Sequence, residues 1–496
     1  MDLLQLFSIF PGIPAHALEG REVLGVTDQV AKVEAGCVFV ALRGRRADGH
    51  QFLSEAIKRG AVALVVEDKH LVPKEYGGFV CQVSDSRSAL DSLAARFYGY
   101  PSTKMFCVGV TGTNGKTSTT YMIEAILNRG GTPCAVMGTV NHHLGSHTWP
   151  TDMTTPGPVD LQKRLREFHE AGARAVAMEI SSHALDQKRA DSVAFDAAVF
   201  TNLTRDHLDY HGSMLSYFAA KERLFSELLA RTSKSPAFAI VNTDTSWGRR
   251  ISLPEGVELF TYGRADADFV WEVKSVDFSS IVFDLVSPGG RVEVSLPMAG
   301  LHNVQNATAA LAVGFVAGVD IQTGARALAE FSGVPGRLQS VPNRLGISIL
   351  IDYAHSPDAL ANVLQSLQAV RRSARLAGRI HVVFGCGGDR DRGKRPLMAQ
   401  VAVRHADVIW ITSDNPRTED PEKIIADIMG GIPRGSKKQV QAIVDRREAI
   451  ATALKSAQKG DVVLIAGKGH EDYQIVGTNK IPFSDFSVAQ DIAGGE

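Results

Sequence analysis

The stretch GVTGTNGKTSTT at residues 109–120 decides how the middle of this chain folds. It overlaps the apolar run MFCVGV at 105–110, which predicts a buried strand, and it leads into a helical pattern that ends at Gly130 and Gly131. A glycine-rich turn between a strand and a helix directs backbone N–H groups and the positive end of the helix toward an anion. Lys116 adds a mobile cation for terminal phosphates, and Thr117 adds a hydroxyl suited to Mg²⁺. The stretch therefore predicts a loop that binds nucleotide phosphates.

This loop is shorter than the usual phosphate loop, whose pattern is GxxxxGK[ST]. Val110 stands five residues before Gly115, where that pattern has a glycine, and the chain instead has GTNGKT starting at Gly112. A chance Gly-Lys-Thr at the start of a helix is the alternative interpretation. The order of strand, glycines, lysine and helix favours the phosphate loop.

The length and composition indicate a soluble protein with several domains. With 496 residues the chain is long enough for about three domains, and its formal net charge of −1 argues against binding nucleic acid through bulk positive charge. The five cysteines are scattered and form no CxxC pair, so neither a disulfide framework nor a zinc site is expected. No apolar run approaches the length of about 20 residues that crosses a bilayer. We expect a cytoplasmic protein with no nucleic-acid or membrane partner.

Short apolar runs alternate with helical patterns along most of the chain. Because stretches long enough for helices separate these runs, they predict parallel sheets covered on both faces and hence the α/β class. Two stretches rich in turn-forming residues, FYGYPSTKM at 97–105 and FSGVPGRLQSV at 331–341, interrupt the alternation. We therefore expect three domains, at residues 1–100, 101–333 and 334–496. The runs include AVALVV at 61–66, AVAM at 175–178, AAVF at 197–200, SILI at 348–351, HVVF at 381–384, VIWI at 408–411 and VVLI at 462–465.

Acidic and histidine side chains follow the next two apolar runs of the middle domain. Glu179 comes directly after AVAM, and a solvated or capping glutamate is the usual interpretation of such a residue. Because Glu179 is expected in the same sheet as the phosphate loop, we favour a carboxylate that organises a metal ion. The run AAVF leads into a loop with more such side chains, namely Asp206, His207, Asp209 and His211. In the helix after this loop, the spacing of Lys221 alone favours an ordinary surface lysine.

Three apolar runs of the last domain each end in a charged loop marked by glycine or proline. The loops are FGCGGDR at 384–390, TSDNPR at 412–417 and AGKGHE at 466–471. Because ligands of open α/β sheets bind outside the carboxyl ends of the strands, the loops would bring together Arg390, Asp414, Arg417 and Glu471. Two guanidinium groups can each form a bidentate ion pair with a carboxylate, and two acids can bind ammonium groups. The residues predict a ligand with two carboxylates and two amines, with ordinary solvated loop charges as the alternative.

These segments together resemble the Mur ligase family, and the resemblance spans essentially the whole chain. The motifs that carry it occur in the order of the family: GTNGKT, MEISSHAL, TNLTRDHLDYHG, AAKERLF, GLHNVQNATAA, GVPGRLQ, IDYAHSPDAL and GCGGDRDRGKRP. The resemblance implies an N-terminal α/β domain for the UDP end of a substrate, a central P-loop ATPase domain with a parallel sheet, and a C-terminal Rossmann-like domain for an amino acid. It also implies an enzyme that activates a carboxylate with ATP and joins it to an amine.

The resemblance further implies roles for the residues around ATP and Mg²⁺. Lys221 looks like the carbamylated lysine of the family, whose added carboxylate helps to hold a second Mg²⁺, so the expectation of a surface lysine is reversed. Thr117 and Glu179 would hold the first Mg²⁺ with a contribution from His207. The expected catalytic residues are Lys116, Glu179, His207 and Lys221. Contacts with the phosphates of ATP are expected from Gly112, Thr113, Asn114, Gly115, Lys116, Thr117 and Ser118. Asn303 and Asn306 match the residues that face adenine. Arg337 and Asp352 match residues of the last domain that reach the nucleotide.

For the UDP-linked substrate, the resemblance implies contacts with the muramoyl group from Thr154, Thr155, Ser181, Gln187 and Arg189. In the first domain, AGCVFVALRGRRADGHQF resembles the uridine-binding segment, which places Arg45, Arg46 and Ala47 near the nucleotide. The chain departs from the family where Asp-Ser-Arg is usual, because it has Asp28-Gln29-Val30. The serine hydroxyl and the arginine guanidinium group that the family uses there are therefore missing. Arg45 and Arg46 could partly compensate for their loss. The remaining candidate contacts with the UDP-linked substrate are Thr27 and Gln29.

For the amino acid, DNPR and GKGHE resemble the pattern of family members that add meso-diaminopimelate as the third residue of the peptidoglycan stem peptide. The implied contacts are Arg390, Asp414, Asn415, Pro416, Arg417, Gly467 and Glu471. ATP would phosphorylate the D-glutamyl carboxylate of UDP-MurNAc-L-Ala-D-Glu, and the amine of diaminopimelate would attack the acyl phosphate. Because the ATP and amine sites lie on different domains of the family, closure of the domains would assemble the reacting groups.

Three alternatives remain open at this point. A lysine-adding member of the family would share nearly all of these motifs. It would give Arg417 another role, because lysine has no second carboxylate for this side chain to bind. A folylpolyglutamate-type ligase shares the ATP loop but should lack DNPR together with GKGHE. A P-loop switch protein that regulates a partner would need no amino-acid pocket. We expect the chain to act as a monomer on small-molecule substrates.

Overall fold

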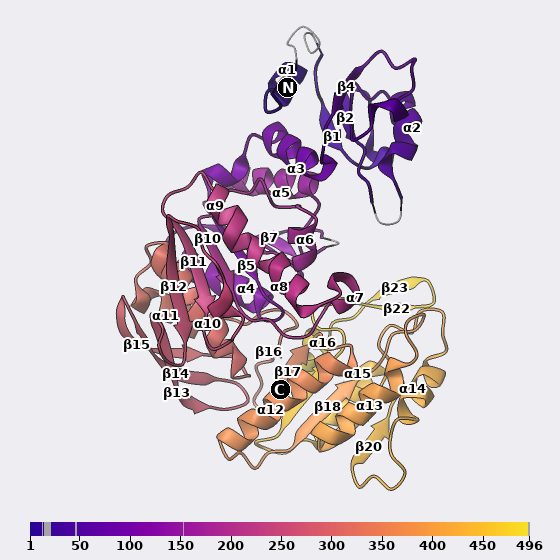
Figure 1. Ribbon diagram of the computed structural model, residues 1–496. Coiled ribbons are helices and arrows are strands. Elements are labelled where there is room, and N and C mark those ends of the chain that lie inside the picture. Colours follow the sequence, from indigo (N-terminus) through magenta and orange to yellow (C-terminus); the bar gives the residue numbers. More distant parts are fainter. Residues whose placement is uncertain (12, 14–20, 45–46, 152, 495–496) are drawn as a thin grey trace. The chain divides into compact units, whose positions relative to one another are not determined.

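The computed structural model describes residues 1–11, 13, 21–44, 47–151 and 153–494 of the chain (Figure 1). The chain divides into two compact units, which are residues 1–263 with 309–319 and residues 264–308 with 320–496. Both units combine helices with sheets that are mostly parallel. The borders of the three predicted domains stay a prediction.

The first sheet of the first unit is parallel throughout and has the order β1-β2-β3-β4. Its strands are β1 (Gly25–Thr27), β2 (Cys37–Val40), β3 (Ala63–Val66) and β4 (Phe79–Gln82). Val38 and Val40 pack with α1 (Leu3–Phe7) and α3 (Ser86–Phe97), whereas Phe39 packs with α2 (Leu53–Lys58) in a second cluster. Helices therefore cover both faces, which explains why β2 and β3 are buried along their whole length and read as continuous apolar runs.

The second sheet of the first unit is centred on β5 (Phe106–Thr111), the strand predicted from MFCVGV. β5 pairs in parallel with β9 (Ala175–Glu179) on one side and with β10 (Ala197–Phe200) on the other. Parallel pairing continues to β6 (Cys134–Met137) beyond β9, and to β11 (Ala237–Asn242) and β12 (Val257–Gly263) beyond β10. An antiparallel hairpin of β7 (His142–Leu144) and β8 (His147–Trp149) follows next to β6. The carboxyl ends of β5, β9 and β10 are thus neighbours, where ligands of such sheets bind.

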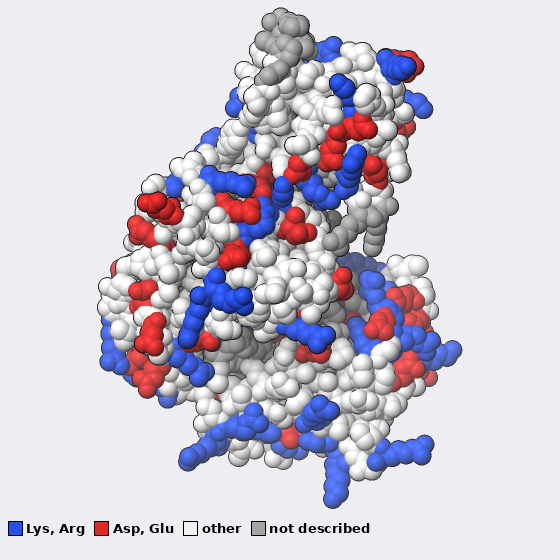
Figure 2. Space-filling model, in the orientation of Figure 1, with Lys and Arg blue, Asp and Glu red and all other residues white. Residues whose placement is uncertain are grey.

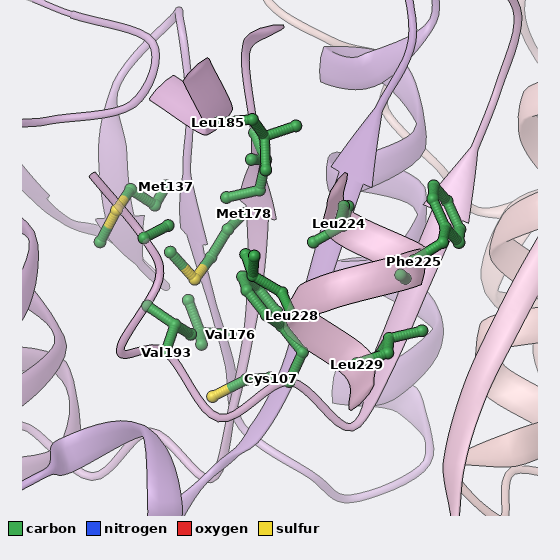
Figure 3. Close-up of a cluster of buried hydrophobic side chains, with 14 of the residues drawn as sticks. Cys107, Met137, Val176, Met178, Leu185, Val193, Leu224, Phe225, Leu228 and Leu229 are labelled. Carbon is green, nitrogen blue, oxygen red and sulfur yellow. The ribbon is translucent and has the colours of Figure 1, made fainter. Parts of the chain in front are cut away.

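Helices fix this sheet and the loop that follows β5. α4 (Lys116–Arg129) begins directly after the loop, as the helical pattern predicts, and its apolar residues at helical spacing are buried: Met122, Ile123, Ile126 and Leu127. A second helical stretch runs through α8 (Met214–Arg223), the π-helical turn η6 (Leu224–Leu228) and α9 (Leu229–Arg231). Figure 3 shows Leu224 and Leu228 of this stretch gathered with Cys107 and Met178 of the strands, and α5 (Pro158–Glu170) contributes to the same cluster. The phosphate loop therefore joins two elements that are held by a packed core.

The second unit holds a six-stranded sheet with the order β16-β17-β21-β18-β19-β20. Its parallel strands are β17 (Ser348–Asp352), β18 (Ile380–Phe384), β19 (Val408–Ile411), β20 (Gln439–Ala442) and β21 (Val462–Ala466), with β16 (Gln339–Ser340) antiparallel at one edge. α12 (Pro357–Ser373), α13 (Lys394–His405) and α14 (Pro421–Met429) pack in one cluster with Leu350 and Val382. α15 (Arg446–Ser456) and α16 (Asp485–Gly494) pack in another with Ile349 and Val383. Because successive strand residues point to opposite faces, the sheet is covered on both sides.

The same unit has smaller parts before and after this sheet. β13 (Phe269–Val276), β14 (Ile281–Ser287) and β15 (Gly290–Leu296) form an antiparallel meander. Along the chain the meander is followed by α10 (His302–Val316), whose residues from 309 on belong to the first unit, and by α11 (Ile321–Ala329). After β21, the hairpin of β22 (Tyr473–Val476) and β23 (Asn479–Pro482) lies against the loop that follows β19, because Arg417 forms a parallel bridge with Val476.

Charged side chains of both signs are interspersed over much of the face shown in Figure 2, in keeping with a net charge of −1. Among the residues that the structure describes, no helix combines the length and the apolar character needed to span a membrane.

All five cysteines are free and buried. Burial raises the pKa of the Cys81 thiol to about 11 and the pKa values of the Cys107 and Cys386 thiols to about 12. Burial also raises the pKa of Cys134 well above its ordinary value. A thiol is reactive as its thiolate, so these side chains act as small core residues.

The carboxyl of Asp91 is buried in α3, and its burial makes the stability of the protein depend on pH. Burial raises the pKa of Asp91 from its ordinary value of 3.8 to about 7; hydrogen bonds with Ser192 oppose the shift, and the charge of Asp191 adds to it. Because the folded state holds this proton more tightly than the unfolded chain does, the stabilising contribution is complete below about pH 4 and is lost as the pH rises through about 7. The loss amounts to at most about 4 kcal/mol.

We therefore expect Asp91→Asn to melt at a higher temperature than the parent chain at about pH 8, because asparagine carries no charge to bury. Near pH 4, where Asp91 is already protonated in the folded state, the difference should shrink. Thermal unfolding followed at several pH values measures both effects, and Glu34→Gln, which changes an exposed acid, is the control. An identical pH dependence in the parent chain and in Asp91→Asn would contradict the prediction.

Candidate functional site

The phosphate loop runs from the end of β5 to the start of α4, and glycine gives it its shape. Gly112 and Gly115 have positive φ angles of 149° and 87°, and a Cβ on Gly112 would lie only 1.9 Å from Oγ1 of Thr201. Nζ of Lys116 donates to the carbonyl oxygens of Gly112 at 2.9 Å and Thr113 at 2.8 Å. The structure thus places a cation over the loop at the N-terminus of a helix, an arrangement that suits phosphate groups.

Two residues that the sequence did not point out hold this loop in place. Oγ1 of Thr201 donates to the carbonyl oxygen of Asn114 at 2.6 Å, and Oδ1 of Asn202 accepts from the backbone N–H of Asn114 at 3.0 Å. The carbonyl oxygen of Asn202 also accepts from the backbone N–H of Thr113 at 2.9 Å. Both residues directly follow β10, the neighbour of β5, and that position was the signal that could have identified them.

Lys221 lies in α8 with only 1% of its surface exposed, so the surface lysine that its spacing favours is wrong. Its Nζ donates to the carbonyl oxygen of Gly112 at 2.9 Å and lies 4.7 Å from the centre of the Tyr217 ring. Burial, and then the charge of Lys116, lower the pKa of Lys221 well below its ordinary value, while Asp206 partly opposes the shift. The structure therefore places a buried amine with increased neutral character against the phosphate loop.

Glu179, at the end of β9, is buried with 1% of its surface exposed, so it is not a solvated glutamate. Its Oε1 accepts from the backbone N–H of Thr139 at 2.8 Å, and its Oε2 accepts from the hydroxyl of Thr139 at 3.2 Å. The hydroxyl of Thr139 also lies 3.0 Å from that of Thr154, a predicted substrate contact. A Cβ on Gly138 would lie 2.3 Å from Oε1 of Glu179, so glycine is needed beside this carboxylate.

His207 is exposed and has a positive φ angle of 51°. Its ring centre lies 4.9 Å from that of His183, and its Nε2 lies 3.6 Å from Oδ2 of Asp206. In the part of the chain that the structure describes, no cluster of three or more His, Cys, Asp or Glu side chains is arranged to hold a metal ion. The predicted metal set has only two side chains of those types and stays a prediction: Thr117, Glu179, His207 and Lys221.

A cavity of about 440 Å³ in the first unit is lined by four of the residues predicted to bind the UDP-linked substrate, namely Thr27, Gln29, Gln187 and Arg189. Nη1 of Arg189 donates to the carbonyl oxygen of Thr155 at 2.9 Å, and Nη2 donates to Oε1 of Gln187 at 2.6 Å. The cavity is also lined by cations that sequence reasoning missed: Lys32, Arg87 and Lys163. These residues are far apart in the sequence, and no local pattern connects them. The lining also holds two acids, Asp28 and Asp160, against four basic side chains, so it has an excess of positive charge that suits an anionic group.

Other predicted substrate contacts lie near this cavity but do not line it. Oγ1 of Thr155 donates to the carbonyl oxygen of Glu179 at 2.8 Å and accepts from the backbone N–H of Ser181 at 3.0 Å. These bonds connect the predicted muramoyl contacts to the strand that carries Glu179. Ala47 is exposed and is not part of the cavity lining, and Arg45 and Arg46 lie outside the described residues.

Of the four residues of the second unit that are predicted to contact the nucleotide, Asn303, Asn306 and Asp352 are buried. Nδ2 of Asn303 donates to the carbonyl oxygen of Ala299 at 2.7 Å, and Nδ2 of Asn306 donates to Oδ1 of Asn303 at 2.9 Å. Burial raises the pKa of Asp352, while the nearby Arg337 opposes the shift. The carboxylate of Asp352 accepts hydrogen bonds from the backbone N–H groups of Leu338 and Ala354, each at 2.9 Å. The nucleotide contacts of these four residues stay predictions.

The three charged loops of the second unit meet at the carboxyl ends of β18, β19 and β21, as their positions in the sequence predict. A Cβ on Gly387 would lie 2.9 Å from Nη1 of Arg417 and 3.7 Å from Cγ of Arg390, so the two arginines flank one glycine. A Cβ on Gly467 would lie 2.7 Å from Oδ2 of Asp414. The loops therefore come together through glycines that leave room for charged side chains.

The DNPR loop has a defined conformation. Arg417 has a positive φ angle of 51°, and its Nη1 donates to the carbonyl oxygen of Gly388 at 2.8 Å. Nδ2 of Asn415 donates to Oε2 of Glu471 at 2.9 Å, and Pro416 is buried. Two guanidinium groups and two carboxylates at neighbouring strand ends can recognise a ligand with carboxylates and ammonium groups.

Comparison with known proteins agrees with this arrangement. Three family models match successive parts of the chain: Mur ligase family, catalytic domain, at residues 25–98; Mur ligase middle domain at 110–314; and Mur ligase, glutamate ligase domain, at 336–469. The UDP-N-acetylmuramoyl-L-alanyl-D-glutamate–2,6-diaminopimelate ligase of Geobacter sulfurreducens is 45% identical over 482 residues, covering 94% of this chain and 93% of its own. The ligase of the same name from Geobacillus kaustophilus is 43% identical over 492 residues, and the match covers 99% of this chain and 99% of that ligase.

A solved structure of a ligase of that name is also similar along the whole chain. It is 32% identical, has a TM-score of 0.73, and the match covers 100% of this chain and 99% of that one. The predicted α/β fold with three Mur ligase domains is confirmed by these matches. The chain belongs to the Mur ligase family.

Proposed function

We propose that this chain is an ATP-dependent ligase that adds meso-2,6-diaminopimelate to UDP-N-acetylmuramoyl-L-alanyl-D-glutamate, a step in the synthesis of peptidoglycan precursors. The observation that carries the proposal is that Arg390, Asp414, Arg417 and Glu471 lie in loops at the ends of three neighbouring strands. Such a set fits an amino acid with two carboxylates and two ammonium groups. Relatives that are 45% and 43% identical to this chain carry the name of that activity.

In the first half-reaction, the terminal phosphoryl group of ATP passes to the free carboxylate of the D-glutamyl residue, and ADP leaves. Lys116, which bonds the loop carbonyls of Gly112 and Thr113, can turn to the phosphates and stabilise the charge that develops during transfer. The remaining phosphate contacts come from the backbone N–H groups of the loop and from the N-terminus of α4.

The donor set beside the loop fits Mg²⁺. The hydroxyl of Thr117 and the carboxylate of Glu179 are hard oxygen ligands of the kind that Mg²⁺ prefers, and a carbamate on Lys221 would add another, with a contribution from His207. Bound there, Mg²⁺ would neutralise charge on the phosphates. Glu179 is already oriented by Thr139, so little rearrangement of its side chain is needed.

In the second half-reaction, the amine of diaminopimelate attacks the carbonyl carbon of the acyl phosphate. A C–N bond forms, the C–O bond to phosphate breaks, and the amine loses a proton. Arg417 and Arg390 hold the carboxylate at the distal end of diaminopimelate, while Asp414 and Glu471 hold its ammonium group. These four side chains orient the amine without taking part in bond formation.

The cavity of the first unit is the proposed site for the UDP-linked substrate. Arg87, Lys163 and Arg189 give it a basic lining that suits the diphosphate of UDP, and Gln29 replaces the serine that is usual in the family. The proposed enzyme acts in the cytoplasm as a monomer on small molecules.

Substrate-dependent release of phosphate tests the proposed function. We expect release to need ATP, Mg²⁺, the UDP-linked dipeptide and meso-diaminopimelate together, and kcat/KM with lysine to be at least about 100-fold lower, because lysine lacks the second carboxylate. Equal rates with lysine would make the chain a lysine-adding ligase. Release that depends on a folate and glutamate, or on ATP alone, would reject the proposal.

A further inference from the structure

Lys468, in the loop after β21, is a lysine whose side chain is entirely buried. Its Nζ donates to Oε2 of Glu471 at 2.9 Å and to Oδ1 of Asn415 at 3.1 Å, and it lies 5.5 Å from the centre of the Tyr473 ring. Taking an ammonium group out of water is costly unless partners compensate it. Neither phosphoryl transfer nor the binding of a carboxylate uses this cation directly, so its burial calls for another explanation.

The first effect of Lys468 is to fix the amide of Asn415. Oδ1 of Asn415 accepts from Lys468 and, at 3.0 Å, from the backbone N–H of Ile475 in β22. Both of these groups only donate hydrogen bonds, so the amide oxygen has to face them. The NH₂ group of Asn415 then has to face Glu471, to which it donates at 2.9 Å.

The second effect is on the carboxylate of Glu471. Lys468 and Asn415 both donate to Oε2, which leaves Oε1 as the oxygen that can meet an ammonium group of the ligand. Asp414 is arranged in a similar way, because its Oδ1 accepts from the backbone N–H of Asn415 at 2.7 Å and its Oδ2 faces Gly467. Each acid thus has one oxygen bound within the protein, which leaves the other oxygen for a ligand.

The third effect concerns the charge of the pocket. Lys468 adds one positive charge to the charged side chains of the three loops, which include Arg390, Asp414, Arg417 and Glu471. Diaminopimelate has two ammonium groups and two carboxylates and is neutral overall, whereas lysine carries one net positive charge. The positive charge of Lys468 beside Glu471 therefore disfavours lysine relative to diaminopimelate.

We propose that Lys468 is a positioning residue that determines the choice of amino acid, by orienting Asn415 and Glu471 and by adding a positive charge beside them. The inference rests on the proposed function. It extends the recognition of the second carboxylate by Arg417 to the ammonium group of the same ligand, which Asp414 and Glu471 bind.

Lys468→Met tests the inference, because methionine has a similar length and no charge. We expect KM for diaminopimelate to rise at least about tenfold, and the ratio of kcat/KM for diaminopimelate to that for lysine to fall at least about tenfold. KM for ATP and for the UDP-linked dipeptide should stay within about twofold. Lys480→Met is the matched control, because Lys480 lies 3.7 Å from the same Tyr473 ring but is exposed.

A double-mutant cycle separates positioning from general destabilisation. If Lys468 acts through Asn415, Lys468→Met and Asn415→Ala should be clearly less than additive in their effect on KM for diaminopimelate. If Lys468→Met does not fold, Lys468→Gln, which keeps a hydrogen-bond donor without the charge, should show the same loss of selectivity.

The outcomes distinguish the two proposals. A parent chain that does not use diaminopimelate rejects the proposed function itself. A parent chain that uses it, together with a folded Lys468 variant of unchanged KM and unchanged selectivity, overturns only the role of Lys468. Equal increases in KM for all three substrates would also overturn it, since a merely structural lysine would behave in that way.

Discussion

Replacing Lys221 with alanine is expected to lower kcat by at least about a thousandfold, because phosphoryl transfer depends on charge that is placed in advance around the phosphates. Lys221 lies 2.9 Å from the carbonyl oxygen of Gly112 in the phosphate loop and is buried. Its lowered pKa favours the neutral amine, which can attack CO₂ to form a carbamate and release a proton. The variant would lose the contact with the loop and could not form this carboxylate.

Two measurements distinguish a carbamate from a simple structural lysine. Formate or acetate added to Lys221→Ala should restore part of the activity, because a small carboxylate can enter the space that the side chain leaves. In the parent chain, isotopically labelled bicarbonate should give an NMR signal of a carbamate that Lys221→Ala lacks. Lys234, which is paired with Asp196 at 2.5 Å, is the control lysine, and Lys234→Ala should keep the signal. Activity of Lys221→Ala within about tenfold of the parent chain would contradict the prediction.

Arg417→Ala is expected to lower kcat/KM for diaminopimelate at least about 100-fold, while KM for ATP and for the UDP-linked dipeptide changes little. The side chain stands beside Arg390 at Gly387, and its guanidinium group is held by the carbonyl oxygen of Gly388 at 2.8 Å. Loss of this fork removes the partner of the second carboxylate. Lysine has no such carboxylate, so the small activity with lysine should not fall in proportion.

The controls for Arg417 come from the same part of the chain. Arg392→Ala removes an exposed arginine that pairs with Asp427 at 3.0 Å, and it should leave kcat/KM for diaminopimelate nearly unchanged. Arg417→Lys keeps the charge but not the planar fork and should lie between alanine and the parent chain. Steady-state kinetics with each amino acid measures these differences. If Arg417→Ala lost activity with diaminopimelate and lysine by the same factor, Arg417 would not recognise the second carboxylate.

Burial explains why much of the fold could be predicted from the sequence. Strands with both faces covered, such as β3, β18 and β21, are continuous apolar runs and stand out between helical patterns. The antiparallel strands are not continuous apolar runs of this kind. In β15 exposed and buried residues are mixed, and β8 has no buried residue, so neither strand has a run long enough to notice.

The candidate site could be predicted where it depends on loops at strand ends, and not where it depends on burial. The phosphate loop and the three charged loops follow apolar runs directly, so their order in the sequence predicts where they meet. Lys221 and Lys468 could not be recognised as buried, because a long aliphatic side chain with a charged end suits a surface equally well. The contact of Lys221 with Gly112 joins residues that are 109 positions apart, and no local pattern encodes it.

The burial of every native cysteine has a practical consequence for observing this enzyme at work. Because the thiols are buried and four of them have strongly raised pKa values, maleimide reagents should leave the folded parent chain almost unlabelled. New cysteines at exposed positions of the two compact units can then carry a fluorescent donor and acceptor without removal of a native residue. Energy transfer between the dyes would report how the distance between the units changes as ATP, the UDP-linked dipeptide and diaminopimelate are added in turn.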